Sequence, residues 1–320
     1  MINGHGDDLH NYSHVEANFS SNVYNGFSHQ GLFEHLSASM HLVTSYPEPS
    51  PLSLERHIAE EKGVKAENVM VTNGATEAIY LIARAFSQFE AVISQPSFSE
   101  YADACRHNHG QDHLRWFCIP NNPTGQVMPR QDILRLVAEH PTDIFVVDAS
   151  YAAYTKEKLL SVEDIISRDN VLMLSSMTKD YGVPGLRLGY VVANCRLLDS
   201  VRAERMPWSV NALAIEAGHY LLSHRDEYQI PIERLIAERQ RMEAELHAMG
   251  ISTYHSDSHM LLCVLPHGDA STLKQDLVQN HGILIRDASN FETLSPQHFR
   301  IAVQNEKQNN ELLKALRQWI

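Results

Sequence analysis

Cysteine is scarce in this chain, and the few that occur exclude two kinds of stabilising site. The 320 residues include four cysteines, Cys105, Cys118, Cys195 and Cys263, and no two of them form a CxxC pair. With this spacing they fit neither a disulfide framework nor a zinc site. We interpret them as reduced thiols of a cytoplasmic protein.

Basic residues are in deficit too. The chain has 26 Lys and Arg against 39 Asp and Glu, a formal net charge of −13. Such a protein repels phosphate backbones and anionic membrane surfaces, so we expect no nucleic acid and no membrane as partners. A small anionic ligand stays compatible with this charge, because a few arginines and a helix N-terminus are enough to bind it.

Long apolar segments are missing as well. The longest apolar runs, such as Val171–Leu174, are far too short to cross a bilayer. Residues Met1 to His10 are polar and lack the apolar core of a signal peptide. Both observations favour a cytoplasmic location.

Histidine, by contrast, is abundant, with 19 residues. The densest group, His107, His109 and His113, lies in a polar stretch, and no HExxH or comparable ligand spacing occurs. We therefore expect these histidines at the surface and predict no metal site.

The first two thirds of the chain alternate between strand and helix patterns. Strands are predicted over 68–72, 91–94, 114–119, 143–147, 171–174 and 188–192, with helices over 76–86 and 131–139. Short apolar strands separated by helices predict an α/β fold in which helices cover both faces of a mostly parallel sheet.

After Pro207 the pattern changes. Helices are predicted over 212–222, 232–249 and 309–320, and strands over 260–265, 282–286 and 299–303. This mixture is typical of a smaller α+β domain. We place the large domain at residues 25–210 and the small one at residues 1–24 and 211–320.

Lys179 is the first candidate for chemistry. It follows Ser176 and Thr178, and Arg187 lies shortly after it. Hydroxyls and a guanidinium suit phosphate oxygens, while a lysine amine of lowered pKa can attack an aldehyde. Taken alone, an ordinary surface lysine is the better interpretation.

Asp148 changes that balance, because an aspartate at the end of a buried strand needs a partner. The protonated ring nitrogen of pyridoxal 5′-phosphate (PLP) would be one. Further residues at strand ends suit the same ligand: Asn122 and Tyr151 for the ring hydroxyl, Phe98 for the ring face, and the amides of Gly74, Ala75 and Thr76 for the phosphate.

Taken in order, these motifs resemble the fold-type I PLP-dependent enzymes, in the branch that contains histidinol-phosphate aminotransferase. The resemblance runs from Asn18 to Ile320. It rests on Asn73 to Glu77, Pro96-Ser97-Phe98, Pro120 to Gly125, Asp148 to Tyr151, Ser176 to Lys179 and Gly185-Leu186-Arg187.

Within that branch, other segments are similar to the threonine-phosphate decarboxylases of cobalamin biosynthesis. These segments are Met206 to Ala214, Phe19 to Asn22, Ile283 to Arg286 with Asn290, and an early His5-Gly6.

The resemblance implies a role for each candidate. Lys179 would carry the cofactor as a Schiff base and Asp148 would face the ring nitrogen. Ser176, Thr178 and Arg187 would hold the cofactor phosphate, and Tyr46 would reach it from the other subunit of a homodimer. Arg300 would bind the substrate carboxylate, and His5, Asn22 and Arg286 are candidates for the substrate's phosphate or carboxylate.

The chain departs from the family pattern in several places. Asp148-Ala149-Ser150 stands where the family usually has Asp-Glu-Ala, Ser175 where it commonly has Arg, and Val23 to Gly26 where it has Asn-Pro-Leu-Gly. Between Tyr101 and Asn121 relatives carry an additional strand and helix. Since that strand lies at the sheet edge, we predict a six-stranded sheet instead of seven.

Three functions stay open at this point. The first is decarboxylation of L-threonine O-3-phosphate to (R)-1-amino-2-propanol O-2-phosphate. The second is an aminotransferase acting on histidinol phosphate, because both reactions begin in the same way and differ in which bond at Cα is aligned for cleavage. The third is a binding protein of this fold without catalysis, which retention of Lys179, Asp148, Asn122, Arg187 and Arg300 disfavours.

Overall fold

The fold is that of a computed structural model, which describes residues 8–320, so His5 lies outside the described residues. The strands are β1 (Ala17–Asn18), β2 (Val69–Thr72), β3 (Glu90–Ile93), β4 (His113–Cys118), β5 (Ile144–Asp148), β6 (Val171–Ser176), β7 (Gly189–Ala193), β8 (Ser252–Thr253), β9 (Met260–Val264), β10 (Ile283–Leu284), β11 (Arg286–Asp287) and β12 (His298–Ala302).

The α-helices are α1 (Gln30–Ala38), α2 (Leu52–Lys62), α3 (Gly74–Ala85), α4 (Glu100–Ala104), α5 (Arg130–Glu139), α6 (Val162–Ile166), α7 (Met177–Tyr181), α8 (Cys195–Arg202), α9 (Ala212–Ser223), α10 (Ile232–Ala248), α11 (Ala270–His281) and α12 (Glu306–Trp319). Among residues 8–320, no helix combines the length and the apolar content needed to span a bilayer.

The main sheet has six strands in the order β2-β7-β6-β5-β4-β3. Strands β3 to β6 run parallel, whereas β7 is antiparallel to both β6 and β2. The predicted six-stranded, mostly parallel sheet is therefore confirmed. A single helix, α4, joins β3 to β4, which is the segment that the sequence predicts to be shortened.

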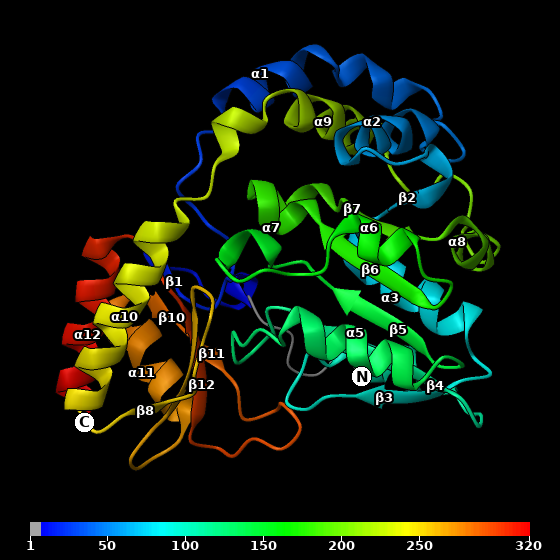
Figure 1. Cartoon of the computed structure of the whole chain (residues 1–320). Helices are drawn as coiled ribbons and strands as arrows, with labels where there is room; N and C mark the ends of the chain where they lie inside the picture. Colours follow the sequence, from blue (N-terminus) through cyan, green and yellow to red (C-terminus); the bar gives the residue numbers. More distant parts are fainter. Residues whose placement is uncertain (1–7) are drawn as a thin grey trace.

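Alternating side chains of the central strands pack on opposite faces of this sheet. Val146 and Leu172 belong to the apolar cluster on one face, and Phe145 and Val171 to the cluster on the other. Helices α3 and α8 cover the first face, and α2, α5 and α9 the second, as Figure 1 shows. β-branched and aromatic residues at both faces explain why these segments are strands buried on two sides.

A smaller antiparallel sheet, β11-β12-β9-β8, forms the second part of the fold. Helices α10, α11 and α12 pack beside it (Figure 1). One prediction is corrected here, because residues 282–286 do not form one strand. β10 pairs with β1 in a separate two-stranded sheet, while β11 pairs with β12.

Helix α9 lies beyond residue 210 in the sequence but packs with α1 and α2 over the main sheet (Figure 1). The N-terminal strand β1 pairs instead with β10, next to the smaller sheet. The boundaries at residues 24 and 210 stay a prediction.

Candidate active site

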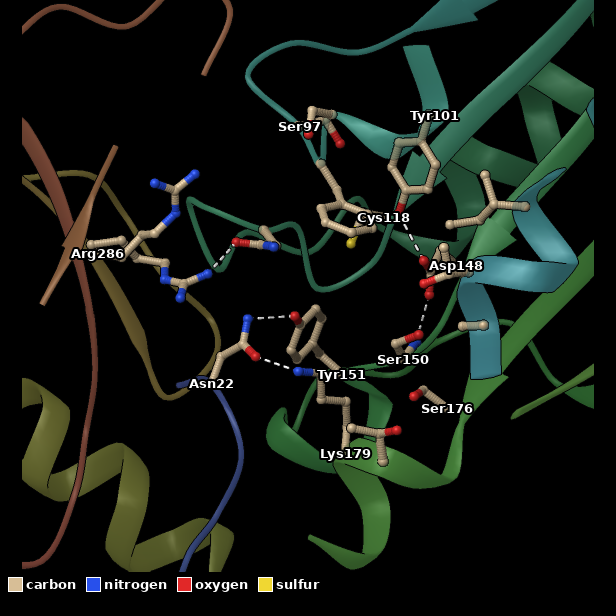
Figure 2. Close-up of a pocket in the computed structure, with 18 of the residues that line it drawn as sticks. Asn22, Ser97, Tyr101, Cys118, Asp148, Ser150, Tyr151, Ser176, Lys179 and Arg286 are labelled. Atoms are coloured by element: carbon tan, nitrogen blue, oxygen red, sulfur yellow. Dashed lines mark hydrogen bonds between the residues drawn. The ribbon is translucent and has the colours of Figure 1, made fainter. Parts of the chain in front are cut away.

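A cavity of about 390 Å3 opens where the two parts of the fold meet, at the carboxyl ends of β4, β5 and β6. This is the edge at which ligands bind in parallel sheets, because the loops that follow the strands converge there. Its lining includes residues from the main sheet (Cys118, Asp148, Ser176, Lys179) and from the smaller sheet (Arg286, Arg300). Figure 2 shows the side chains that face this cavity.

Lys179 lies just beyond the end of β6, on the short helix α7 that Gly182 ends in a left-handed conformation. Its amine donates a hydrogen bond to Oδ1 of Asn22, and Nδ2 of Asn22 donates to the hydroxyl of Tyr151 at 2.5 Å (Figure 2). Nζ of Lys179 also lies 5.4 Å from the centre of the Tyr151 ring. The predicted residues Lys179, Asn22 and Tyr151 therefore meet at one wall of the cavity.

Asp148 ends β5 and is buried, with 5% of its surface exposed. Its carboxylate accepts hydrogen bonds from the hydroxyl of Tyr101 at 2.7 Å and from the amide of Ser150 at 2.9 Å (Figure 2). No Lys or Arg of residues 8–320 forms an ion pair with it. A buried carboxylate with two neutral donors and no cation is suited to a cationic ligand group.

Tyr101 is a site residue that the sequence did not indicate. Its ring stacks on Trp116 with centroids 5.0 Å apart, and burial together with the Asp148 charge raises the pKa of its hydroxyl well above the usual value. Tyr101 therefore stays a neutral hydrogen-bond donor to Asp148. The sequence signal that could have indicated Tyr101 is its position beyond the end of β3, three residues after the predicted site residue Phe98.

The N-terminus of α3 faces the same cavity through Ala75 and Thr76. Gly74 has a φ of +77°, and a Cβ there would lie 2.6 Å from Nη2 of Arg187. Only glycine accommodates this backbone with the guanidinium so close. Ser176, Thr178 and Arg187, also predicted for a phosphate, line the same cavity as Ala75 and Thr76.

Arg300 and Arg286 extend into the cavity from β12 and β11. Arg300 is 2% exposed and donates to Oδ1 of Asn122 at 2.6 Å and to the carbonyl of Ser20. Asn122, predicted to contact a ring hydroxyl, thus also orients Arg300. The antiparallel register places Arg286 directly opposite Arg300 on the neighbouring strand.

Arg286 is held by hydrogen bonds to Oδ1 of Asn290 at 2.7 Å and to the carbonyl of Asp287, and its guanidinium lies 5.1 Å from the Phe291 ring centre. Burial and the Arg300 charge lower the pKa of Arg286 to about 10. The Asp287 and Asp8 carboxylates act against this shift, and two desolvated cations side by side still favour an anion between them. This wall is therefore suited to an anionic ligand.

Of two further residues predicted to contact the cofactor, Phe98 lies at the cavity and Tyr46 does not. Phe98 lines the cavity and meets the Tyr101 ring edge-on at a centroid distance of 5.7 Å. Tyr46 does not line the cavity of its own chain. It is 88% exposed and lies beside Trp208, with ring centroids 5.6 Å apart. Its predicted contact from a second subunit stays a prediction.

Comparison with known proteins places this geometry in a family. Residues 16–116 and 113–316 match the model of aminotransferase class I and II. The crystal structure of L-threonine-O-3-phosphate decarboxylase from Porphyromonas gingivalis superposes with a TM-score of 0.92 at 36% identity, over 95% of this chain and 99% of that one.

Two curated relatives are similar over most of their length. Threonine-phosphate decarboxylase of Salmonella typhimurium is 28% identical over 86% of this chain and 83% of its own. Histidinol-phosphate aminotransferase of Thermoanaerobacter sp. is 30% identical over 86% of this chain and 84% of its own. Both activities foreseen from the sequence thus occur among its relatives.

Proposed function

The chain belongs to the aminotransferase class I and II family, whose members bind PLP, and we propose that it is a PLP-dependent decarboxylase of L-threonine O-3-phosphate. The product would be (R)-1-amino-2-propanol O-2-phosphate, a cobalamin precursor. The buried pair Arg286 and Arg300 carries this proposal, because the substrate has both a phosphate and a carboxylate.

The residues present fit the cofactor. Asp148 offers a buried carboxylate without a cationic partner among residues 8–320, as a protonated ring nitrogen requires. At the other end, glycine at residue 74 lets the Arg187 guanidinium lie against the start of α3, and together they would suit a phosphate. Lys179 lines the same cavity and would be the covalent attachment point.

When bound, PLP supplies an electron sink for the charge that develops at the substrate Cα. The chain's own residues do the rest. Arg300 is anchored on Asn122 and would bind the carboxylate; Arg286, anchored on Asn290, would bind the phosphate. Lys179, held by Asn22, would donate a proton to Cα after the carboxylate leaves as CO2.

The experiment is incubation of the purified protein with PLP and phosphothreonine, followed by assay of CO2 and of the aminopropanol phosphate. We expect both products in equal amounts. Absence of CO2, with conversion of bound PLP to pyridoxamine phosphate by glutamate, would instead establish an aminotransferase. That second function is favoured by the 30% identical histidinol-phosphate aminotransferase.

A homodimer is the proposed assembly, as is usual in this family. Exposed large apolar side chains support it, namely Phe33, Met40, Val43, Tyr46, Met206 and Trp208, of which Tyr46 lies beside Trp208. Exposed aromatic residues that lie together are typical of an interface. We expect the mass of two chains in light scattering, and a monomer would remove Tyr46 from the proposed site.

A further inference from the structure

His259 lies in the polypeptide just before β9, behind the wall that carries Lys179. It is 1% exposed. Its ring stacks on Tyr154 with centroids 4.0 Å apart and planes inclined by 27°, and the Tyr151 ring centre is 6.5 Å away. Thus a residue of the smaller sheet region packs on two tyrosines of the loop that follows β5.

Tyr154 bonds to the backbone on both sides of the Lys179–Asn22 hydrogen bond, at Lys179 itself and close to Asn22. Its hydroxyl donates to the carbonyl of Lys179 at 2.8 Å and accepts from the amide of Tyr24 at 2.8 Å. Tyr24 is two residues from Asn22, which accepts from the Lys179 amine. Because Tyr154 is fully buried and His259 covers its ring, a shift of His259 would be passed to both sides of that hydrogen bond.

The surroundings keep the imidazole uncharged. The charged groups near it are Lys179 and Arg300, both cations, and burial together with these charges lowers the pKa of His259 to about 3. The Asn22 backbone acts in the opposite direction as a weak hydrogen-bond partner of the ring, and no other group of residues 8–320 bonds to the ring nitrogens. A buried imidazole with so little hydrogen bonding contributes to the fold mainly through the faces of its ring.

We propose that His259 is a positioning residue for Lys179, acting through the stacked ring of Tyr154 on the Lys179–Asn22 hydrogen bond. This inference rests on the proposed PLP site, though not on which reaction occurs there. In this role the flat face of the His259 ring, next to β9, fixes the Tyr154 ring, and Tyr154 in turn fixes the backbone of α7 at Lys179. Substitutions that keep or remove a flat ring therefore separate this role from ordinary packing.

The test compares His259→Gln, which removes the ring, with His259→Phe, which keeps one. The first readout is the pH titration of the absorbance of bound PLP without substrate, which reports the Lys179 environment. We expect His259→Gln to shift its midpoint by about one unit, since loss of a neighbouring contact moves a pKa by roughly that much. We expect His259→Phe to shift it by less than half as much.

The second readout is kcat with phosphothreonine. Small displacements at an active site lower rates by about ten- to a hundredfold, and we expect a loss in this range for His259→Gln with little change in KM. The matched control is His267→Gln, because His267 is exposed and stacks on Trp319, with centroids 6.0 Å apart. It should leave both readouts unchanged.

Tyr154→Phe keeps the stacked ring but removes the hydroxyl, and should reproduce the His259→Gln shift; it also serves if His259→Gln does not fold. The proposal is overturned if His259→Gln or Tyr154→Phe titrates like the wild type, or if His259→Phe shifts the midpoint as far as His259→Gln. Failure of the proposed function can be told apart from failure of this proposal. In that case the wild-type protein itself binds no PLP or releases no CO2 from phosphothreonine, whatever the variants do.

Discussion

The two walls of the cavity are built in different ways. On the main-sheet wall, Asp148 ends a strand, Ser176 ends the next one, and Lys179 lies on the short helix α7 that follows. On the other wall, Arg286 and Arg300 lie within antiparallel strands and are oriented by hydrogen bonds from their side chains. Strand ends position the first wall, and side-chain contacts position the second. The first wall should therefore govern chemistry and the second affinity.

Lys179→Ala tests the first wall and should have the largest effect. Without the amine, covalent attachment of PLP and proton transfer at Cα are both lost, so kcat should fall by at least about 10³-fold. Borohydride reduction should fix PLP to the wild type and not to the variant. A variant that keeps more than a tenth of the wild-type kcat would separate Lys179 from the chemistry.

Arg286→Ala tests the second wall. A charge-assisted hydrogen bond contributes about 1.5–3 kcal/mol, so KM for phosphothreonine should rise by roughly 10- to 150-fold while kcat changes little. Binding of threonine, which lacks the phosphate, should change much less. Arg317→Ala is the control, because Arg317 is exposed and pairs with Glu245 on the surface. An unchanged KM in Arg286→Ala would contradict the phosphate role.

Asp180→Asn tests a smaller effect, the pH dependence of stability that a buried carboxyl gives to the main-sheet wall. Burial raises the pKa of Asp180, next to Lys179, to about 7, although Lys62 and Arg225 act against the shift. Because this pKa exceeds the model-peptide value near 4, the unfolded chain loses its proton first as pH rises. Asp180 therefore lowers stability progressively between about pH 4 and pH 7, and fully above that.

The amide of Asp180→Asn cannot ionise, so we expect the variant to be more stable than the wild type at pH 8 and close to it at pH 4. Urea unfolding at the two pH values measures this difference. An equal change in stability at both would show that the Asp180 carboxyl does not titrate abnormally. The second wall has no such dependence near neutrality, since Arg286 loses its proton only near pH 10.

The main-sheet wall could largely be predicted from the sequence. Strand ends can be located from apolar runs and turn residues, so Asp148, Ser176 and Lys179 could be placed together from residue patterns alone. The position of Arg300 came from resemblance alone. That Asn122 orients it could not be foreseen, because the contact joins residues far apart in sequence.

Other features escaped the sequence for the same reason. Tyr101 bonds to Asp148 across 47 positions of the sequence, so no local pattern indicates the contact. The stacking of His259 on Tyr154 depends on how the two parts of the fold meet. Residues 282–286 look like one strand in sequence, since no turn residue separates β10 from β11.

The pairing of β1 with β10 bears on when the enzyme becomes competent during its synthesis. Ala17 aligns with Ile283, so these strands meet only after most of the chain has left the ribosome. Asn22 follows β1 directly and holds the Lys179 amine. Contacts between distant segments form late. A nascent chain could thus complete its main sheet and still lack an oriented Lys179 until the segment that carries β10 has been made.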